Sequence, residues 1–201
     1  MLEEYRVGRG SLREALRILE VHGLISIKPG PRGGPTVDQV HTENFGRMST
    51  LYFQMDGVTF ADLVEARVIM EPTLAALAAQ RHDPRLLTEM TRFTRPSRID
   101  DEEYARDSAD FHRLVAALSG NPVMSLFGQS LTDIVQERVS PPLFPKSRRP
   151  AVLNVHCDIA TAIIDGDVDR AGELMREHML EYAAYVRRRQ PGLMQEVVDW
   201  R

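Results

Sequence analysis

The chain has 201 residues, 43% of them hydrophobic, which is room for one medium domain with a small module or for two small domains. Its formal net charge of −4 excludes a molecule that grips nucleic acid over its whole surface, so any affinity for DNA must be local. The one cysteine, Cys157, excludes an intrachain disulfide, and no apolar stretch approaches the roughly 20 residues that cross a bilayer. We therefore expect a cytoplasmic protein without a membrane segment.

The sequence of residues 6–37 predicts a helix, a glycine that ends this helix, and then a hairpin of two strands joined by a turn. Three arginines, Arg9, Arg13 and Arg17, recur at every fourth position and share one helical face. A stripe of leucines lies on the opposite face of the same helix. Gly23 follows as a stop, and the chain then returns through a glycine-rich basic turn to Val37. The arginine face alone is better explained as a solvated helix surface. The order of the elements, however, favours a winged helix-turn-helix, whose helix enters a major groove.

This run resembles the DNA-binding half of GntR-family transcription regulators, whose pattern V-S-R-T-x-V-R-E-A-L-x-x-L-E-x-x-G-L-I precedes a glycine-rich wing. The matching residues are Val7, Arg9, Leu12, Arg13, Glu14, Ala15, Leu16, Leu19, Glu20, Gly23, Leu24 and Ile25. Gly8 and Gly10 replace the family's Ser and Thr, and Ser11 is expected to take over their phosphate contact or helix cap. The resemblance implies that double-stranded DNA is contacted by Arg9, Ser11 and Arg13 from the helix and by Arg32 and Gly33 from the wing.

Of the helix that the family places before this one, only residues 2–5 are present, so either the chain starts late or its amino-terminal module is incomplete. Residues 1–37 hold six Lys or Arg against four Glu, which makes the module only mildly basic. That balance favours a homodimer combining two weak half-site contacts over a monomer that grips phosphates alone.

From Thr59 onward the pattern is helical almost to the end. A first helix starts at Thr59 or Asp62, and Pro72 should kink or break it. Further helices are expected at 84–94, 101–118, 122–139, 151–164 and 168–189, with no strand after residue 40. The sequence thus predicts a mainly α protein, in which a small, partial winged helix-turn-helix precedes an all-α helical bundle.

Three of the six histidines, His112, His156 and His178, fall at inward helical positions. His156 lies ten residues before the expected turn at Gly166 and His178 twelve after it. At a rise of about 1.5 Å per residue, the heights of the two rings along the paired helices differ by roughly 3 Å, so the rings can face each other. One inward histidine is usually a core residue, whereas three favour zinc, nickel, copper or iron, with positions left open for water or a carboxylate.

The helical part resembles the effector-binding domain of the FadR subfamily, called FCD. Its strings E-x-R-x-x-x-E, D-x-x-F-H-x-x-x-x-x-x-G-N and H-x-x-I-x-x-A-I-x-x-x-D, the last followed by a histidine, correspond to residues 65–71, 108–121 and 156–167, and to His178. The resemblance implies a divalent metal (zinc or nickel) on the three histidines and a small carboxylate effector at Arg67, Ser108 and Asn121. For Arg67 the alternative is a salt bridge with a glutamate of its own helix.

Ser108 departs from the family's aspartate, which lies one helical turn before the first histidine. Asp107 and Asp110 flank it but are offset around the helix by about 100° and 200°, so neither points naturally at a metal. Two alternatives follow. Either three histidines hold the metal, with a water bridged to Ser108, or the metal is lost and the histidines bind an anionic effector directly.

These observations predict a ligand-responsive transcription regulator that binds a palindromic operator and is not an enzyme. One alternative is a metal-dependent hydrolase, although no acidic residue stands at a predictable base position. Another is a ligand sensor that acts through protein contacts only. The expected domains are a partial winged helix-turn-helix at 1–38, a linker at 39–57, an effector-binding and dimerisation domain at 58–190 and a tail at 191–201.

Overall fold

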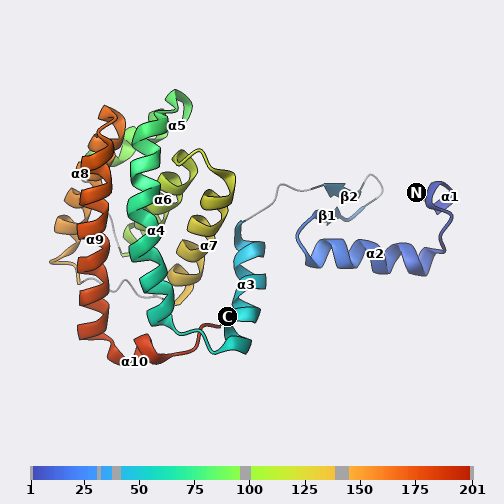
Figure 1. Ribbon diagram of the computed structural model, residues 1–201. Coiled ribbons are helices and arrows are strands. Elements are labelled where there is room, and N and C mark those ends of the chain that lie inside the picture. Colours follow the sequence, from blue (N-terminus) through green and yellow to red (C-terminus); the bar gives the residue numbers. More distant parts are fainter. Residues whose placement is uncertain (1, 31–32, 38–41, 96–100, 139–144, 200–201) are drawn as a thin grey trace. The chain divides into compact units, whose positions relative to one another are not determined.

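The computed structural model describes residues 2–30, 33–37, 42–95, 101–138 and 145–199. The chain divides into two compact units, Met1–Phe45 and Gly46–Arg201 (Figure 1). None of the helices in the described ranges is long and apolar enough to cross a membrane. The fold is mainly α with one small sheet, which confirms the predicted class.

The first unit contains a short helix, a longer helix and a hairpin. Helix α1 spans Leu2–Tyr5 and α2 spans Arg9–Val21, and strands β1 (Ile25–Lys28) and β2 (Gly34–Val37) pair antiparallel. Gly23 follows α2 with φ +67°, and its amide donates to the carbonyl of Glu20. The predicted order of helix, glycine stop and basic hairpin is therefore present, but α2 has no buried residue.

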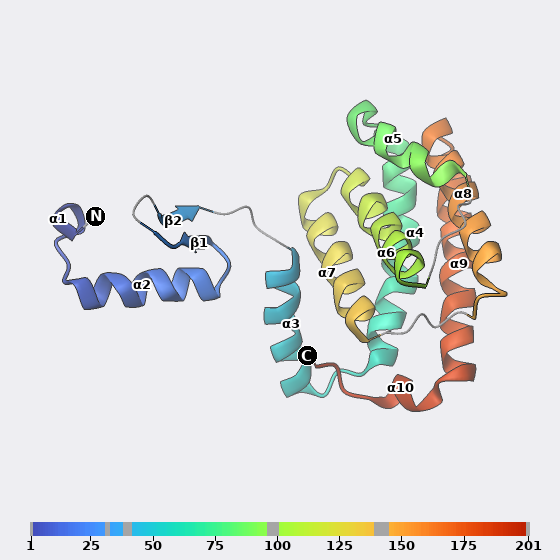
Figure 2. The same cartoon turned by 180° about the vertical axis from the view of Figure 1, so that it is seen from behind.

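The second unit is a helical bundle built around one long central helix, α4, which contacts α6, α7, α8 and α9 (Figures 1 and 2). Helices α6 and α7 pack together on one side of it, and α8 and α9 form an antiparallel hairpin on the other. The helices are α4 (Phe60–Arg81), α5 (Pro84–Met90), a 3₁₀ helix (Thr91–Thr94), α6 (Asp101–Leu118), α7 (Pro122–Arg138), α8 (Arg149–Asp165), α9 (Val168–Arg189) and α10 (Pro191–Gln195).

Helix α4 begins at a capping box, in which the Thr59 hydroxyl accepts from the Asp62 amide and the Asp62 carboxylate accepts from the Thr59 amide at 2.7 Å. The helix then runs through Pro72 without a break, contrary to one of the two outcomes expected there. Proline removes one backbone hydrogen bond, at a cost of about 3 kcal/mol. Because Pro72 is buried and both flanks of α4 are packed, burial outweighs that loss.

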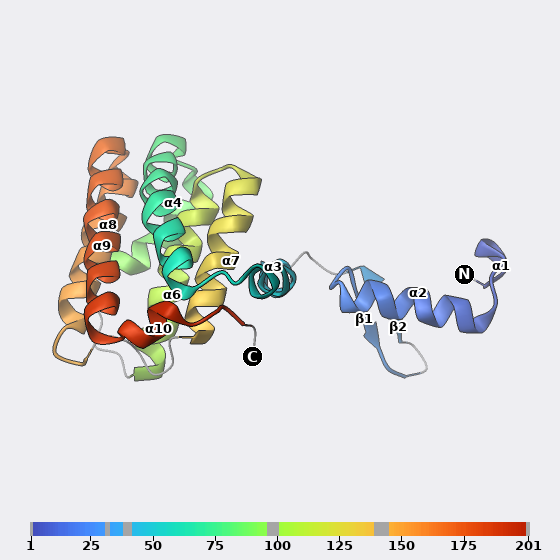
Figure 3. The same cartoon turned by 60° about the horizontal axis from the view of Figure 1, so that its bottom comes forward.

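The structure adds two helices that sequence reasoning did not find. Helix α3 (Thr42–Asp56) lies within residues 39–57, which we expected to be a linker. Helix α10 lies in the expected tail, below α4 and α9 in Figure 3. After it, the Val198 amide donates to the Val58 carbonyl at 2.9 Å, and both Met194 and Val198 are buried. Two side chains of the expected tail, Met194 and Val198, therefore belong to the core of the bundle.

Candidate metal and effector site

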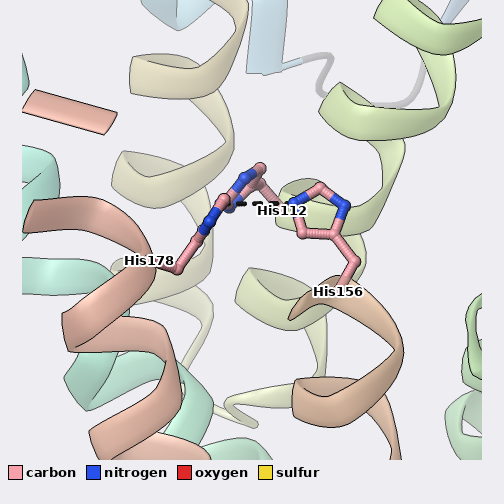
Figure 4. A group of neighbouring side chains, drawn as sticks. All are labelled: His112, His156 and His178. Atoms are coloured by element: carbon pink, nitrogen blue, oxygen red, sulfur yellow. Dashed lines mark hydrogen bonds between the residues drawn. The ribbon is translucent and has the colours of Figure 1, made fainter. Parts of the chain in front are cut away.

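The three histidines meet in the interior of the bundle. His112 comes from α6, His156 from α8 and His178 from α9, and all three are buried. Each offers a ring nitrogen, and these three atoms lie within 4.8 Å of one another (Figure 4). The helical spacing therefore brings together side chains that are far apart in the sequence.

One pair in the cluster has the spacing of two ligands of a single ion. The Nε2 atoms of His156 and His178 are 3.2 Å apart. Two nitrogens that each lie about 2.0–2.1 Å from a tetrahedral zinc ion are roughly 3.3–3.4 Å from each other. The rings of His112 and His178 are stacked at 14°, and the His156 ring stands nearly perpendicular to both. Three buried histidines in this arrangement can hold a divalent metal ion.

His156 is held in place by an aromatic wall. Its ring stacks on Phe111 with centroids 4.1 Å apart, and Phe111 is fully buried. The Nδ1 atom of His156 has no hydrogen-bond partner among the described residues. An unpaired N–H is rarer in protein interiors than an unpaired acceptor. The proton of His156 is therefore best placed on Nε2 in the metal-free protein, and a cation bound at Nε2 would require that proton on Nδ1 instead.

A buried carboxylate orients the third ring. Nδ1 of His112 donates to Oε2 of Glu71, while Nε of Arg67 donates to Oε1 of the same carboxylate at 2.5 Å. All three side chains are buried, and they come from helices α4 and α6. A histidine that donates from Nδ1 presents the lone pair of Nε2, which is the form that binds a metal. The contact with Glu71 thus engages Nδ1 of His112 and leaves Nε2 as the other ring nitrogen.

Burial and the surrounding charges favour neutral rings at His156 and His178. Burial lowers the pKa of His178 to about 3, helped by the charges on His112 and Arg67. Burial and the neighbouring histidines also hold the pKa of His156 well below its usual value. For Glu71, burial alone raises the pKa, but Arg67 and His112 outweigh it and lower that pKa to about 2. At neutral pH the acid is ionised while His156 and His178 keep their lone pairs.

A cavity of about 600 Å³, its open mouth included, lies beside His112 and His178. Hydroxyl, amide and guanidinium groups contribute to its wall: Arg67, Tyr104, Ser108, Thr132, Gln136 and Tyr182. The guanidinium carbon of Arg67 lies 5.5 Å from the centroid of the Tyr182 ring, and burial raises the pKa of Tyr182 to about 12. The cavity thus offers one cation and several neutral polar groups to a ligand beside the histidines.

Comparison with known proteins identifies this bundle. Residues 62–181, more than half of the chain, match the FCD domain family. The chain belongs to the FCD class of GntR-family transcription regulators. It is 28% identical over 186 residues to the HTH-type transcriptional repressor NanR of Cronobacter sakazakii, covering 87% of this chain and 70% of that protein. NanR of Salmonella typhimurium is also 28% identical, over 188 residues that cover 90% of this chain and 71% of the relative.

A solved structure supports the fold of this FCD regulator. Streptococcus agalactiae GntR superposes with a TM-score of 0.64 at 21% identity, covering 91% of this chain and 85% of that one. The NanR relatives are transcriptional repressors by name, and they give no support to the hydrolase alternative. The chain is thus a ligand-responsive, DNA-binding regulator rather than an enzyme.

The acidic neighbours of Ser108 do not line the cavity of this FCD domain, whereas Ser108 does. Asp110 is paired instead with Arg92 at 3.4 Å and with Arg113 at 3.0 Å. Asp107 borders a separate, smaller cavity, and burial raises its pKa. The candidate metal-binding group found among the described residues therefore contains histidines alone, and the hydroxyl of Ser108 lies one helical turn before His112.

Asn121 requires a correction. It is exposed and does not line the cavity, and its Oδ1 accepts from the amides of Val123 and Met124 at 3.0 and 3.2 Å. It is the cap at the start of α7, so we leave it out of the effector site. The sequence carried this signal, because Asn followed by Pro122 at the first helical position is typical of a helix start.

Two further groups went unassigned in the sequence analysis. Glu71 entered it as part of a family string and as one of two salt-bridge partners, with Glu65, considered for Arg67. Its contact with His112, which spans 41 residues of chain, was not foreseen. Tyr182 lies one turn after His178 on α9, a spacing that places both on one face. That face now proves to be the cavity wall.

The residues expected to contact DNA lie in the first unit. Arg9, Ser11 and Arg13 are exposed on α2, and Gly33 precedes β2 in the hairpin. Arg32 lies outside the described residues. The exposed position of the helix residues leaves their side chains accessible to a duplex.

Proposed function

We propose that this regulator binds a palindromic operator as a homodimer and that a small carboxylate in its helical unit changes its affinity for DNA. The observation that carries the proposal is the cavity that joins a buried histidine cluster to Arg67. An ion on the histidines and a guanidinium beside it are two fixed positive groups, and a carboxylate has one oxygen for each.

Arg67 is the group in this cavity that suits a carboxylate. Its Nε is engaged by Glu71, and no described residue accepts a hydrogen bond from its two terminal amino groups. These amino groups therefore remain for an anion, so the salt bridge and the effector contact expected as alternatives are compatible. Ser108, one helical turn from His112, supplies a hydroxyl to the same ligand or to a water beside it.

The residues His112, His156 and His178 would hold a divalent ion, zinc or nickel by the softness of imidazole. When bound, the ion supplies positive charge that attracts the effector carboxylate. The chain's own residues orient the rings, pack Phe111 against His156 and place Arg67 in the cavity that His112 and His178 also line.

In the first unit we assign the major-groove contact to α2 through Arg9, Ser11 and Arg13, and the wing contact to Arg32 and Gly33. We propose residues 1–38 as the DNA-binding domain and residues 58–190 as the effector-binding and dimerisation domain. A homodimer would present its two α2 helices to the two half-sites of the operator. Two linked contacts, each weak alone, then give a much higher affinity for the whole operator. We place this regulator in the cytoplasm, together with the DNA that it binds.

The test begins with selection of duplexes from a random pool by the intact protein, followed by anisotropy titration of the recovered sequence. A panel of small mono-, di- and hydroxycarboxylates is then added, with zinc and with a chelator. We expect a specific, inverted-repeat duplex whose affinity changes at least about tenfold with one acid, as a coupling of about 1.4 kcal/mol requires. Recovery of no specific duplex, or an affinity that no acid alters, would contradict the proposal.

A further inference from the structure

Glu71 stands between two groups that would repel each other across the cavity. One of its oxygens accepts from Arg67 and the other from His112. Arg67 and His112 line the same cavity, so a dication on the histidines and the guanidinium would share one low-dielectric space. The carboxylate is the group that separates them.

We propose that Glu71 is the positioning residue of the histidine site, holding His112 with Nε2 toward the other two rings and shielding that nitrogen from the charge of Arg67. This inference rests on the proposed metal-assisted function and names the residue that makes it possible. It assigns no ligand bond to Glu71, because both of its oxygens are already engaged.

The alternative for Glu71 is a purely structural ion pair of the core. The two roles differ in what they predict about the ring of His112. A structural ion pair stabilises the fold but does not determine which ring nitrogen of His112 carries the proton. A positioning residue fixes one tautomer, because an ionised carboxylate accepts a proton that the ring must then carry on Nδ1.

Glu71→Gln is the primary variant, since it keeps the shape and removes the charge. Glu65→Gln is its matched control, because Glu65 is exposed on the same helix and does not line the cavity. Zinc affinity is measured by competition with a chromogenic chelator, using the intact protein. We expect Glu71→Gln to weaken zinc binding by about 10–100-fold, as loss of an outer-shell partner does. The control should bind as the wild type does.

Removing the guanidinium tests the shielding role. In the Arg67→Met/Glu71→Gln double variant the charge that Glu71 is proposed to shield is absent. We expect part of the lost zinc affinity to return, by about tenfold relative to Glu71→Gln alone. A double variant that binds zinc no better than Glu71→Gln would overturn the shielding half of the proposal.

A measurement on the wild type keeps the proposal testable should the variants fold poorly. Nitrogen NMR of ¹⁵N-histidine-labelled protein reports which ring nitrogen carries the proton. We expect His112 to be protonated at Nδ1 without metal, and zinc to shift its Nε2 alone. A proton on Nε2 overturns the proposal, as does unchanged zinc binding by a folded Glu71→Gln. Failure of the wild type to bind zinc would instead remove the metal from the proposed function itself, and this inference with it.

Discussion

The Nε2 atoms of His156 and His178 face each other at 3.2 Å across the hairpin of α8 and α9. The hairpin turns at Gly166, whose φ of +73° is a left-handed conformation that few residues other than glycine adopt without strain. Both histidines therefore depend on one turn for their register. A metal site built this way forms with the packing of the hairpin rather than after it.

The first prediction concerns the histidines as ligands. His178→Asn removes one of three nitrogens, and zinc affinity should fall by at least about 100-fold, more than an outer-shell loss produces. His82→Asn is the control, because His82 is exposed at the end of α4 with φ +49°, a conformation that asparagine tolerates. Chelator competition on both variants gives the comparison. Equal zinc binding by the two would remove His178 from the site.

A second prediction concerns pH. Because the folded state depresses the pKa of His178 to about 3 and that of His156 below its usual value, the unfolded chain binds more protons below about pH 6.5. Stability is therefore complete above that pH and is lost as the pH falls, by roughly 1.4 kcal/mol per pH unit for each ring. Urea unfolding with a chelator present should show a loss of about 4 kcal/mol between pH 7 and 5. His178→Gln should reduce that loss by about half, and a flat profile would contradict the shifts.

A third prediction concerns the buried pair of Arg67 and Glu71. Arg67→Met leaves the buried carboxylate of Glu71 without its cation and with His112 as its remaining partner. Glu71→Leu leaves the buried guanidinium of Arg67 without its carboxylate. Each change should cost about 3–5 kcal/mol of unfolding free energy. The double variant should lose clearly less than the sum of the two single losses, because both charges are then gone and only the hydrogen bond of His112 to Glu71 is still missing. Arg170→Met breaks an exposed pair with Glu173 and should change stability by less than about 0.5 kcal/mol. Additive losses in the double variant would show that the two side chains do not interact.

Periodicity predicted the parts of the bundle in which each helix has clear ends. Helix α6 was expected at 101–118 and lies there, and the start and end of α9 agree with residues 168 and 189. Helix α3 was missed because its sequence has a weak apolar face and a glycine at position 46. Helix caps and apolar stripes are formed by residues that are close in sequence, and the sequence alone therefore predicts them.

The candidate site was predictable only in part, for the same reason. The two histidines of the hairpin are linked by a short turn, so counting residues placed their rings opposite each other. The contact of His112 with Glu71 joins α6 to α4 and depends on how those helices pack, which no local pattern defines. Asn121 was misassigned because a family string was preferred to its local role as a helix cap.

A fourth prediction concerns Ser108. An aspartate there would add a carboxylate one turn before His112, on the wall of the cavity, and should raise zinc affinity by about tenfold or more through charge and an added ligand. The same added charge at Ser147, which is exposed before α8, is the control and should leave zinc affinity unchanged. If both variants bind zinc equally, position 108 does not face the ion.

The last prediction concerns the hairpin that we assign to DNA. A Cβ on Gly33 would lie 2.0 Å from the backbone oxygen of Lys28, so Gly33→Ala must displace one strand against the other. Operator affinity should fall by about tenfold, which corresponds to ~1.4 kcal/mol, because the tip no longer meets the duplex in register. Gly192→Ala places the same methyl group in open space on α10 and should bind as the wild type does. Anisotropy titration decides between them, and equal affinities would mean that the hairpin does not contribute to DNA binding.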